Sequence, residues 1–258
     1  MLLPPQDSAN PQSVLFWPPA MVVWGPGQMT ELHRHHATQV VLALAGNLVL
    51  SQHAMDAPPI PCAGALVPSN APHAIDARGV DAIIVFAEPR SDLGRALAQC
   101  AGAAKAAPLP HDLVLSARAL LPPNAEPHKI RAVVPALLAS LGAPLIEPQL
   151  VHPAVRRVLR HLEESHSGID TSLSALAGLA GLSPGRFMHA FTTSVGSALR
   201  PYLLWQKLGH AARAMATGAT PSAAAAEAGF ADAAHLTRTF RRTFGVTPTQ
   251  AQQRRLSP

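Results

Sequence analysis

The chain has 258 residues, of which 48% are hydrophobic and 14% are charged, with a formal net charge of +5. This length predicts two domains, and the apolar content excludes an intrinsically disordered chain. No apolar run approaches the ~18 residues of a membrane span, and the first ten residues lack a signal-peptide pattern. Cys62 and Cys100 are too isolated to predict a disulfide framework or a cysteine-based zinc site. We therefore expect a cytoplasmic protein without a membrane partner.

Charge and proline divide the chain near Gln149. Residues 1–149 hold eight basic and ten acidic residues, a net charge of −2, whereas residues 150–258 hold twelve basic and five acidic residues, a net charge of +7. Twenty of the 26 prolines lie in the first part. The asymmetry predicts two architectures and favours contact between the second part and a polyanion. Charge alone leaves a merely solvated basic surface open.

Short apolar segments between glycines and prolines predict strands in the first part, at 40–44, 47–50 and 82–87. His33, His35 and Gln39 share the same parity, so on an extended strand they would project from one face. His73 follows a second strand-and-turn unit. Three imidazoles and an amide oxygen form a neutral ligand set that suits one divalent transition metal ion, namely Zn, Ni, Fe or Cu.

The spacing around these histidines resembles the first cupin motif. Gly27 is followed by five residues, His33-x-His35, three residues, position 39, six residues and Gly46. Gln39 stands where the family usually has glutamate. The resemblance covers about residues 21–87 and implies a cupin-like β-barrel, or jelly roll, with a metal or ligand site inside.

The second cupin motif is matched in part. Gly64 and Pro68 are closer together than usual, Asn70 stands where glycine is expected, and His73 fits. Two interpretations of the histidines stay open: they bind a metal ion, or they line an effector pocket or form hydrogen bonds inside the barrel. The other histidines of this part, His36, His53, His111 and His128, are expected at the surface or in loops.

Two segments after the barrel have helical apolar spacing, 92–105 and 128–141. Pro135 should bend the second helix or lie near its start. The proline-rich segment 144–153 is predicted to be a stiff linker.

Two similar helix-turn-helix repeats are predicted in the second part. Residues 173–183 lead into 186–191 and end at Gly196, and residues 222–230 lead into 235–240 and end at Gly245. Gly181 and Gly229 hold equivalent places and suit the positive φ that ends a first helix, whereas Ala177 and Ala225 suit a close helix crossing. Ser183 and Asp232 are the expected N-caps of the two second helices.

These repeats resemble the AraC-type DNA-binding domain over about residues 150–255. The matching elements are His152-Pro-Ala-Val155, Leu176-Ala177, Ala180-Gly181-Leu182-Ser183, Tyr202-Leu-Leu-Trp-Gln-Lys-Leu208, Ala228-Gly229-Phe230, Ala234-His235-Leu236, Arg238, Phe240-Arg241-Arg242, Phe244-Gly245 and Pro248. The resemblance implies two helix-turn-helix units, joined by a long helix over about 197–217, that enter successive major grooves. The expected DNA-binding residues are Arg186, Met188, His189, Ala233, Ala234, Thr237, Arg238, Arg241 and Arg242.

The sequence thus predicts an α+β protein with a cupin-like barrel (1–90), a helical connector (91–147) and a double helix-turn-helix domain (148–258). We expect a DNA-binding transcriptional regulator and not an enzyme, in which the barrel senses a small molecule or metal. A helix between these domains forms the dimer contact in regulators of this type, so we expect a homodimer through 128–141, with double-stranded DNA and RNA polymerase as partners. Two alternatives stay open: a metal-dependent cupin enzyme with a DNA-binding tail, and a direct metal-sensing regulator.

Overall fold

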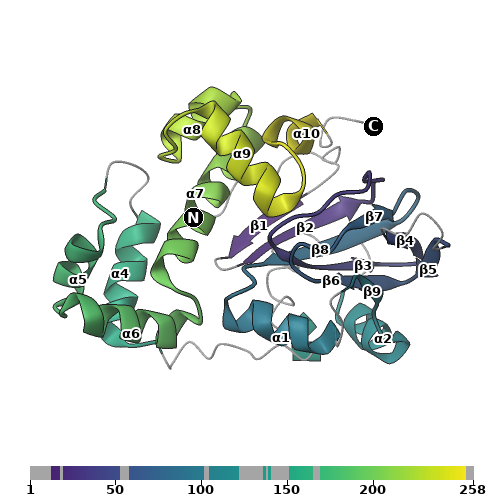
Figure 1. Ribbon diagram of the computed structural model, residues 1–258, viewed down its shortest axis with the longest axis horizontal. Helices are drawn as coiled ribbons and strands as arrows, with labels where there is room; N and C mark the ends of the chain where they lie inside the picture. The colour runs from purple at the N-terminus through teal and green to yellow at the C-terminus, as the bar shows by residue number, and fades with distance from the viewer. Residues whose placement is uncertain are drawn as a thin grey trace.

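The computed structural model describes residues 13–17, 20–52, 58–101, 105–121, 136–137, 139–140, 151–164 and 169–253. An antiparallel sheet region with two flanking helices comes first along the chain, and a helical region follows it (Figure 1). This is the mixed α+β composition that the sequence predicted. None of the described helices has both the length and the apolar character needed to cross a bilayer.

The strands form two antiparallel sheets. The larger sheet has the order β1-β2-β8-β3-β6-β9 and the smaller one has the order β5-β4-β7. Their bounds are Ser13–Trp17 (β1), Ala20–Pro26 (β2), Thr38–Ala43 (β3), Leu48–Gln52 (β4), Ile60–Cys62 (β5), Gly64–Val67 (β6), His73–Asp76 (β7), Asp81–Ala87 (β8) and Ala107–Pro108 (β9). The three predicted strands correspond to β3, β4 and β8. Membership of the cupin family is not decided by this pairing and stays a prediction.

Two helices pack against the larger sheet. Helix α1 (Asp92–Ala101) occupies most of the predicted segment 92–105, and α2 (His111–Ala119) was not predicted. Leu97 and Val114 from these helices join Leu42 and Val85 of the sheet in one buried core. Most of the predicted dimer helix 128–141, the linker up to residue 150 and the boundary between the predicted domains lie outside the described residues.

The helical region contains the two predicted helix-turn-helix units. The first unit is α5 and α6 and the second is α8 and α9, with α7 between them. The bounds are Pro153–Glu164 (α4), Leu173–Ala180 (α5), Pro184–Val195 (α6), Leu199–Ala216 (α7), Pro221–Glu227 (α8), Ala233–Phe244 (α9) and Pro248–Gln253 (α10). The long helix α7 is close to its predicted range.

The turns of both units follow the expected chemistry. Ala177 and Ala225 are each 1% exposed where the helices cross. Gly181 has φ 67° and Gly229 has φ 72°, the left-handed conformation that glycine adopts without steric cost. Equivalent backbone bonds close the two turns, from Leu182 N–H to the carbonyl of Ala177 and from Phe230 N–H to that of Ala225. The repeat seen in the sequence is therefore a repeat in the structure.

The two units have different neighbours. The first unit packs with α4 around Phe187 and Phe191, in a core of its own. The second unit shares its core with the sheet region, because Met21, Ala37 and Phe86 are buried together with residues of α7, α8 and α9. In Figure 1, α9 and α10 accordingly lie next to the sheet, and α4, α5 and α6 lie to its side.

Candidate nucleic-acid interface and histidine cluster

Helix α6 is the second helix of the first unit and is the expected recognition helix. It begins with Pro184 in the first turn, and Phe187 and Phe191 fix its inner side in the core. Three of the predicted DNA-binding residues, Arg186, Met188 and His189, are exposed on its other side. Ser183 occupies the N-cap position as predicted, with Pro184 in the first turn, but its side chain makes no cap hydrogen bond.

Helix α9 is the second helix of the second unit and is the expected recognition helix. Asp232 caps it as predicted, since its Oδ1 accepts a hydrogen bond of 2.6 Å from His235 N–H. Leu236, Phe240 and Phe244 bury the inner side. Ala234, Arg238, Arg241 and Arg242 are exposed, whereas Ala233 and Thr237 are half-buried. Seven of the nine side chains expected to contact DNA are thus exposed, and the other two are half-buried.

Three of the four predicted metal ligands come together in one group, which we call the histidine cluster (His33, His35 and His73). Their candidate ligand atoms all lie within 4.8 Å of one another. His35 is 2% exposed and His73 is fully buried. The expectation that one extended strand carries His33, His35 and Gln39 is wrong, because β3 begins only at Thr38. An isolated bridge between His33 and His73 brings the histidines together instead.

Each ring of the histidine cluster is oriented by a backbone carbonyl. Nδ1 of His33 lies 2.8 Å from the carbonyl of Glu31, Nδ1 of His35 lies 3.0 Å from that of Ala37, and Nδ1 of His73 lies 2.9 Å from that of Ala71. A carbonyl only accepts, so each neutral ring carries its proton on Nδ1 and its lone pair on Nε2. Histidines that ligate metals through Nε2 are commonly oriented in this way.

The electrostatics favour the neutral form of the two buried rings, His35 and His73. Burial, together with the charges of neighbouring histidines, lowers the pKa of His35 to about 4 and that of His73 to about 3. Nε2 of His73 is buried and has no hydrogen-bond partner among the described residues. A buried lone pair without a partner is costly unless a ligand or ion fills the position.

Gln39 adds an oxygen to the site. Its Oε1 lies 2.6 Å from Nε2 of His35. With the His35 proton on Nδ1, this contact places two lone pairs opposite each other. A cation that binds both atoms would remove the conflict, and otherwise the amide must turn its NH₂ group toward the ring. The donor set therefore fits a divalent transition metal.

Backbone conformation and packing explain the residue type at two positions of the predicted cupin motifs. A side chain at Gly27 would collide with backbone atoms of Ala77 and Val80, so the backbone approach needs glycine there. Asn70, at the place where cupins usually have glycine, has φ 61°. Asparagine is one of the residues that tolerates this left-handed conformation.

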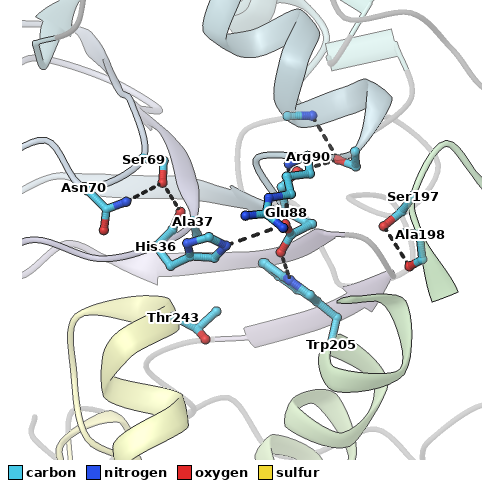
Figure 2. A network of polar contacts seen from close by, with 12 residues as sticks. His36, Ala37, Ser69, Asn70, Glu88, Arg90, Ser197, Ala198, Trp205 and Thr243 are labelled. Atoms are coloured by element: carbon cyan, nitrogen blue, oxygen red, sulfur yellow. Dashed lines mark hydrogen bonds and ion pairs between the residues drawn. The ribbon is translucent and has the colours of Figure 1, made fainter. Parts of the chain in front are cut away.

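Sequence reasoning missed a polar contact between the sheet region and α7. Figure 2 shows Glu88, which is 4% exposed, between His36 and Trp205. Its Oε2 accepts a hydrogen bond of 2.9 Å from Trp205 Nε1, and its Oε1 lies 3.6 Å from His36 Nε2. Burial raises the pKa of Glu88, but these contacts outweigh it and hold the pKa below its ordinary value. His36 lies in a loop, as expected, and its ring also takes part in this contact.

Both recognition helices end against the N-terminal region. The carbonyl of Gly196, the C-cap of α6, accepts a hydrogen bond of 2.7 Å from Asp92 N–H at the start of α1. In the last turn of α9, the carbonyl of Arg242 accepts one of 2.7 Å from His36 N–H. No local pattern signals these contacts, because their partners are distant in the sequence.

An apolar cavity of about 150 Å³ lies between the sheet region and the second unit. The sheet and helices supply its apolar walls, and polar atoms of the histidine cluster reach it. Lining residues include Met21, Ile84, Met215, Phe240, His33 and His73. The cavity could hold a small, largely apolar molecule next to the cluster.

Comparisons with known proteins agree with the helical part of this description. Residues 176–254 match the family HTH_18, described as a helix-turn-helix domain. Over 118 residues the chain is 34% identical to the transcriptional activator NphR of a Rhodococcus species, a match that covers 45% of this chain and 34% of NphR. The chain thus spans about a third of the length of this curated relative.

Two solved structures are also similar. The DNA-binding domain of AdpA, a global transcriptional factor solved in complex with a target DNA, is 27% identical with a TM-score of 0.36, and the match covers 39% of this chain and 90% of that one. ToxT from Vibrio cholerae O395 is 11% identical with a TM-score of 0.48, over 93% of this chain and 98% of that one.

The fold and these comparisons define the class of the helical region. It contains an AraC-type helix-turn-helix domain, and the chain is similar to AraC-family transcriptional activators and regulators. The relative that matches this region is a transcriptional activator, in line with the DNA-binding domain that the sequence predicted.

Proposed function

We propose that this chain is a DNA-binding transcriptional regulator in which α6 and α9 enter successive major grooves. The observation that carries the proposal is the pair of helix-turn-helix units, each with an aromatic inner side and an exposed polar outer side on its recognition helix. The net charge of +7 on residues 150–258 supports binding to a polyanion. A location in the cytoplasm follows from this role.

The expected DNA-contacting residues of α6 and α9 fall into three groups by the chemistry of their side chains. Arg186, His189, Thr237 and Arg238 can hydrogen-bond to base edges, whereas Met188, Ala233 and Ala234 can contact only apolar groups such as the thymine methyl. Arg241 and Arg242 lie in the last turn of α9 and suit phosphates. We infer that base recognition depends mainly on the four polar side chains.

Binding of the full chain to labelled duplexes from its own promoter region, followed by fluorescence anisotropy over a salt series, tests this proposal. We expect affinity to fall as salt rises, because phosphate contacts release counterions. Arg238→Ala should weaken binding about tenfold, the effect of losing one base contact. Arg78→Ala is the matched control, since it removes the same charge from the sheet region. Binding that is insensitive to salt, or equal losses in both variants, would contradict the proposal.

We further propose that the sheet region is the sensor and that its effector site is the histidine cluster with the adjoining cavity. Three observations support a metal ion as effector: the convergence of the three rings, the carbonyl bonds that hold Nδ1, and the unpartnered Nε2 of His73. The residues that would hold the ion are His33, His35 and His73, with Gln39 as a fourth ligand. The ion would link them into one rigid centre.

Metal content distinguishes a metal effector from a metal-free ligand pocket. Protein purified without a histidine tag should bind about one Zn²⁺ per chain, and the double variant His33→Ala/His35→Ala should lose it. His111→Ala, an exposed histidine at the start of α2, is the control and should keep the metal. Equal metal content in the wild type and the double variant would overturn the metal proposal and leave DNA binding untouched.

Dimerisation through 128–141 and contact with RNA polymerase remain proposals of the same kind. They rest on the resemblance to AraC-type regulators, because most of the segment lies outside the described residues. Analytical ultracentrifugation of the full chain and of Leu137→Glu would test the dimer. Leu137 is 1% exposed and belongs to the sheet core, so the fold of the variant must be checked by circular dichroism.

A further inference from the structure

We propose that a divalent metal ion in the histidine cluster holds the second helix-turn-helix unit against the sheet region, so that metal binding and docking of α9 strengthen each other. The inference rests on the metal-binding function proposed above and adds how occupancy of the site would reach the DNA-binding surface. It is carried by the contacts between the C-terminal turn of α9 and the segment that bears the metal ligands.

The first step is a pair of backbone hydrogen bonds. His36 N–H donates to the carbonyl of Arg242 over 2.7 Å, and Ala37 N–H donates to that of Thr243 over 3.2 Å. Both donors lie between the ligands His35 and Gln39. Docking of α9 therefore holds the ligand-bearing segment in the conformation that directs its side chains inward, which lowers the conformational cost of binding an ion.

The second step is the position of Gly245 over the cluster. A Cβ atom at Gly245 would lie 2.6 Å from Nε2 of His33 and closer still to its Cδ2, so only glycine allows this approach. Because that position is nearer to Cδ2 than to Nε2, Gly245 covers the ring edge and does not lie along the lone pair. The docked unit thus covers one side of the cluster at His33.

The third step is electrostatic. The carbonyl end of α9 is its negative end, with about half an elementary charge, and it lies against the cluster. Each of the three rings directs Nδ1 to a backbone carbonyl, so its Nε2 offers a lone pair to a cation. A cation in the cluster is therefore attracted by the last turn of α9, most strongly when the helix is docked.

These three steps predict that metal binding and docking of α9 favour each other. A metal ion gains from the preorganised segment, the shielding glycine and the helix end, all of which exist only in the docked arrangement. By linkage, the ion must stabilise docking by the same free energy. Docking fixes α9 relative to the sheet region, whereas α6 packs in a separate core and meets the N-terminal region at the Gly196–Asp92 hydrogen bond described above. Metal occupancy therefore controls how freely α9 can adjust relative to α6 on DNA.

A pair of glycine variants tests the coupling. Gly245 and Gly181 are both left-handed C-cap glycines, with φ 79° and 67°, so alanine strains the backbone similarly at each. A Cβ atom at Gly181 meets no atom of the described residues within 4 Å, whereas one at Gly245 collides with His33. By chelator competition, we expect Gly245→Ala to bind Zn²⁺ at least about tenfold more weakly than Gly181→Ala, a typical coupling between sites. Equal Zn²⁺ affinities would overturn the proposal.

Hydrogen exchange of the wild-type chain gives a reciprocal measurement that needs no variant. Zn²⁺ should slow exchange at the amides of His36 and Ala37, which donate to α9, and leave the amide of Leu182 in the first unit unchanged. Unchanged exchange at His36 and Ala37 with Zn²⁺ bound would overturn the coupling alone. Absence of Zn²⁺ binding would overturn the metal proposal as well. Fluorescence anisotropy with promoter DNA on the same samples measures DNA binding separately. Retained DNA binding would show that either negative result leaves the proposed regulator function standing.

Discussion

At the scale of single residues, the most informative feature is a set of buried neutral imidazoles. His35 and His73 are almost completely buried, yet each has one nitrogen satisfied by a backbone carbonyl. Burial keeps their pKa values at about 4 and about 3, below the ordinary 6.5. Rings of this kind do not have to lose a proton before they bind a metal at pH 7.

The lowered pKa values predict how the stability of the metal-free protein depends on pH. Above pH 6.5 both imidazoles are neutral in the folded and unfolded chains, so they contribute no pH dependence. As pH falls from 6.5 toward 4, the unfolded chain binds protons that the folded chain does not, and the free energy of unfolding decreases. Each such histidine contributes about 1.4 kcal/mol per pH unit within this window.

Urea unfolding at pH 7, 6 and 5 in a chelating buffer measures this effect. His73→Gln keeps a polar side chain that does not titrate, so its free energy of unfolding should fall less steeply with decreasing pH than that of the wild type. His111→Ala removes an exposed histidine and should leave the steepness unchanged. Parallel pH dependences of wild type and His73→Gln would show that His73 titrates normally in the folded protein.

At the scale of elements, the two recognition helices look alike in the sequence but begin differently. Asp232 binds the first turn of α9 through its side chain, whereas Ser183 at the same position of α6 does not. Helix α6 instead begins with Pro184, whose fixed φ suits the first turn. The sequence motif thus identifies the cap position, and the side-chain rotamer decides whether the hydrogen bond forms.

The cap difference predicts unequal effects of two alanine substitutions. Asp232→Ala should lower the free energy of unfolding by about 1 kcal/mol, because a backbone N–H at the start of α9 loses its acceptor. Ser183→Ala removes no hydrogen bond and should cost clearly less. Chemical denaturation of both variants is the measurement, and similar losses would show that Ser183 also caps its helix in solution.

At the scale of the whole molecule, the helix-turn-helix pair is divided between two cores. Phe86 of the sheet contacts Phe244 of α9, with ring centroids 5.3 Å apart, so the second unit and the sheet share apolar surface. Phe187 belongs to the core of the first unit. We therefore expect the second unit to unfold together with the sheet region and the first unit to open more independently.

A pair of core truncations tests this division. Phe86→Ala should destabilise the chain by about 3 kcal/mol or more and speed hydrogen exchange in α9 far more than in α5. Phe187→Ala, a fully buried residue of the other core, should have the opposite pattern. Uniform acceleration in both units after either substitution would mean that the helical region opens as one unit.

Local chemistry made much of the molecule predictable from the sequence alone. Helix periodicity, the glycines with positive φ and the repeated Ala–Gly spacing located both helix-turn-helix units. The spacing of His33, His35, Gln39 and His73 predicted that these side chains lie close together, which the structure shows, and metal binding by them stays a prediction. The predicted geometry was wrong in one respect, because a loop and a bridge, and not one strand, bring His33 and His35 into place.

Only the tertiary structure decided where the second unit lies and what it contacts. Trp205 and Glu88 are 117 residues apart, and Gly245 reaches His33 from the far end of the chain. Such contacts depend on how two cores fit together, and neither periodicity nor spacing contains that information. The charge pattern of the sequence distinguished the basic helical region from the slightly acidic sheet region. The fold brings the two regions together beside the histidine cluster, because apolar residues of the sheet and of the second unit are buried in one shared core.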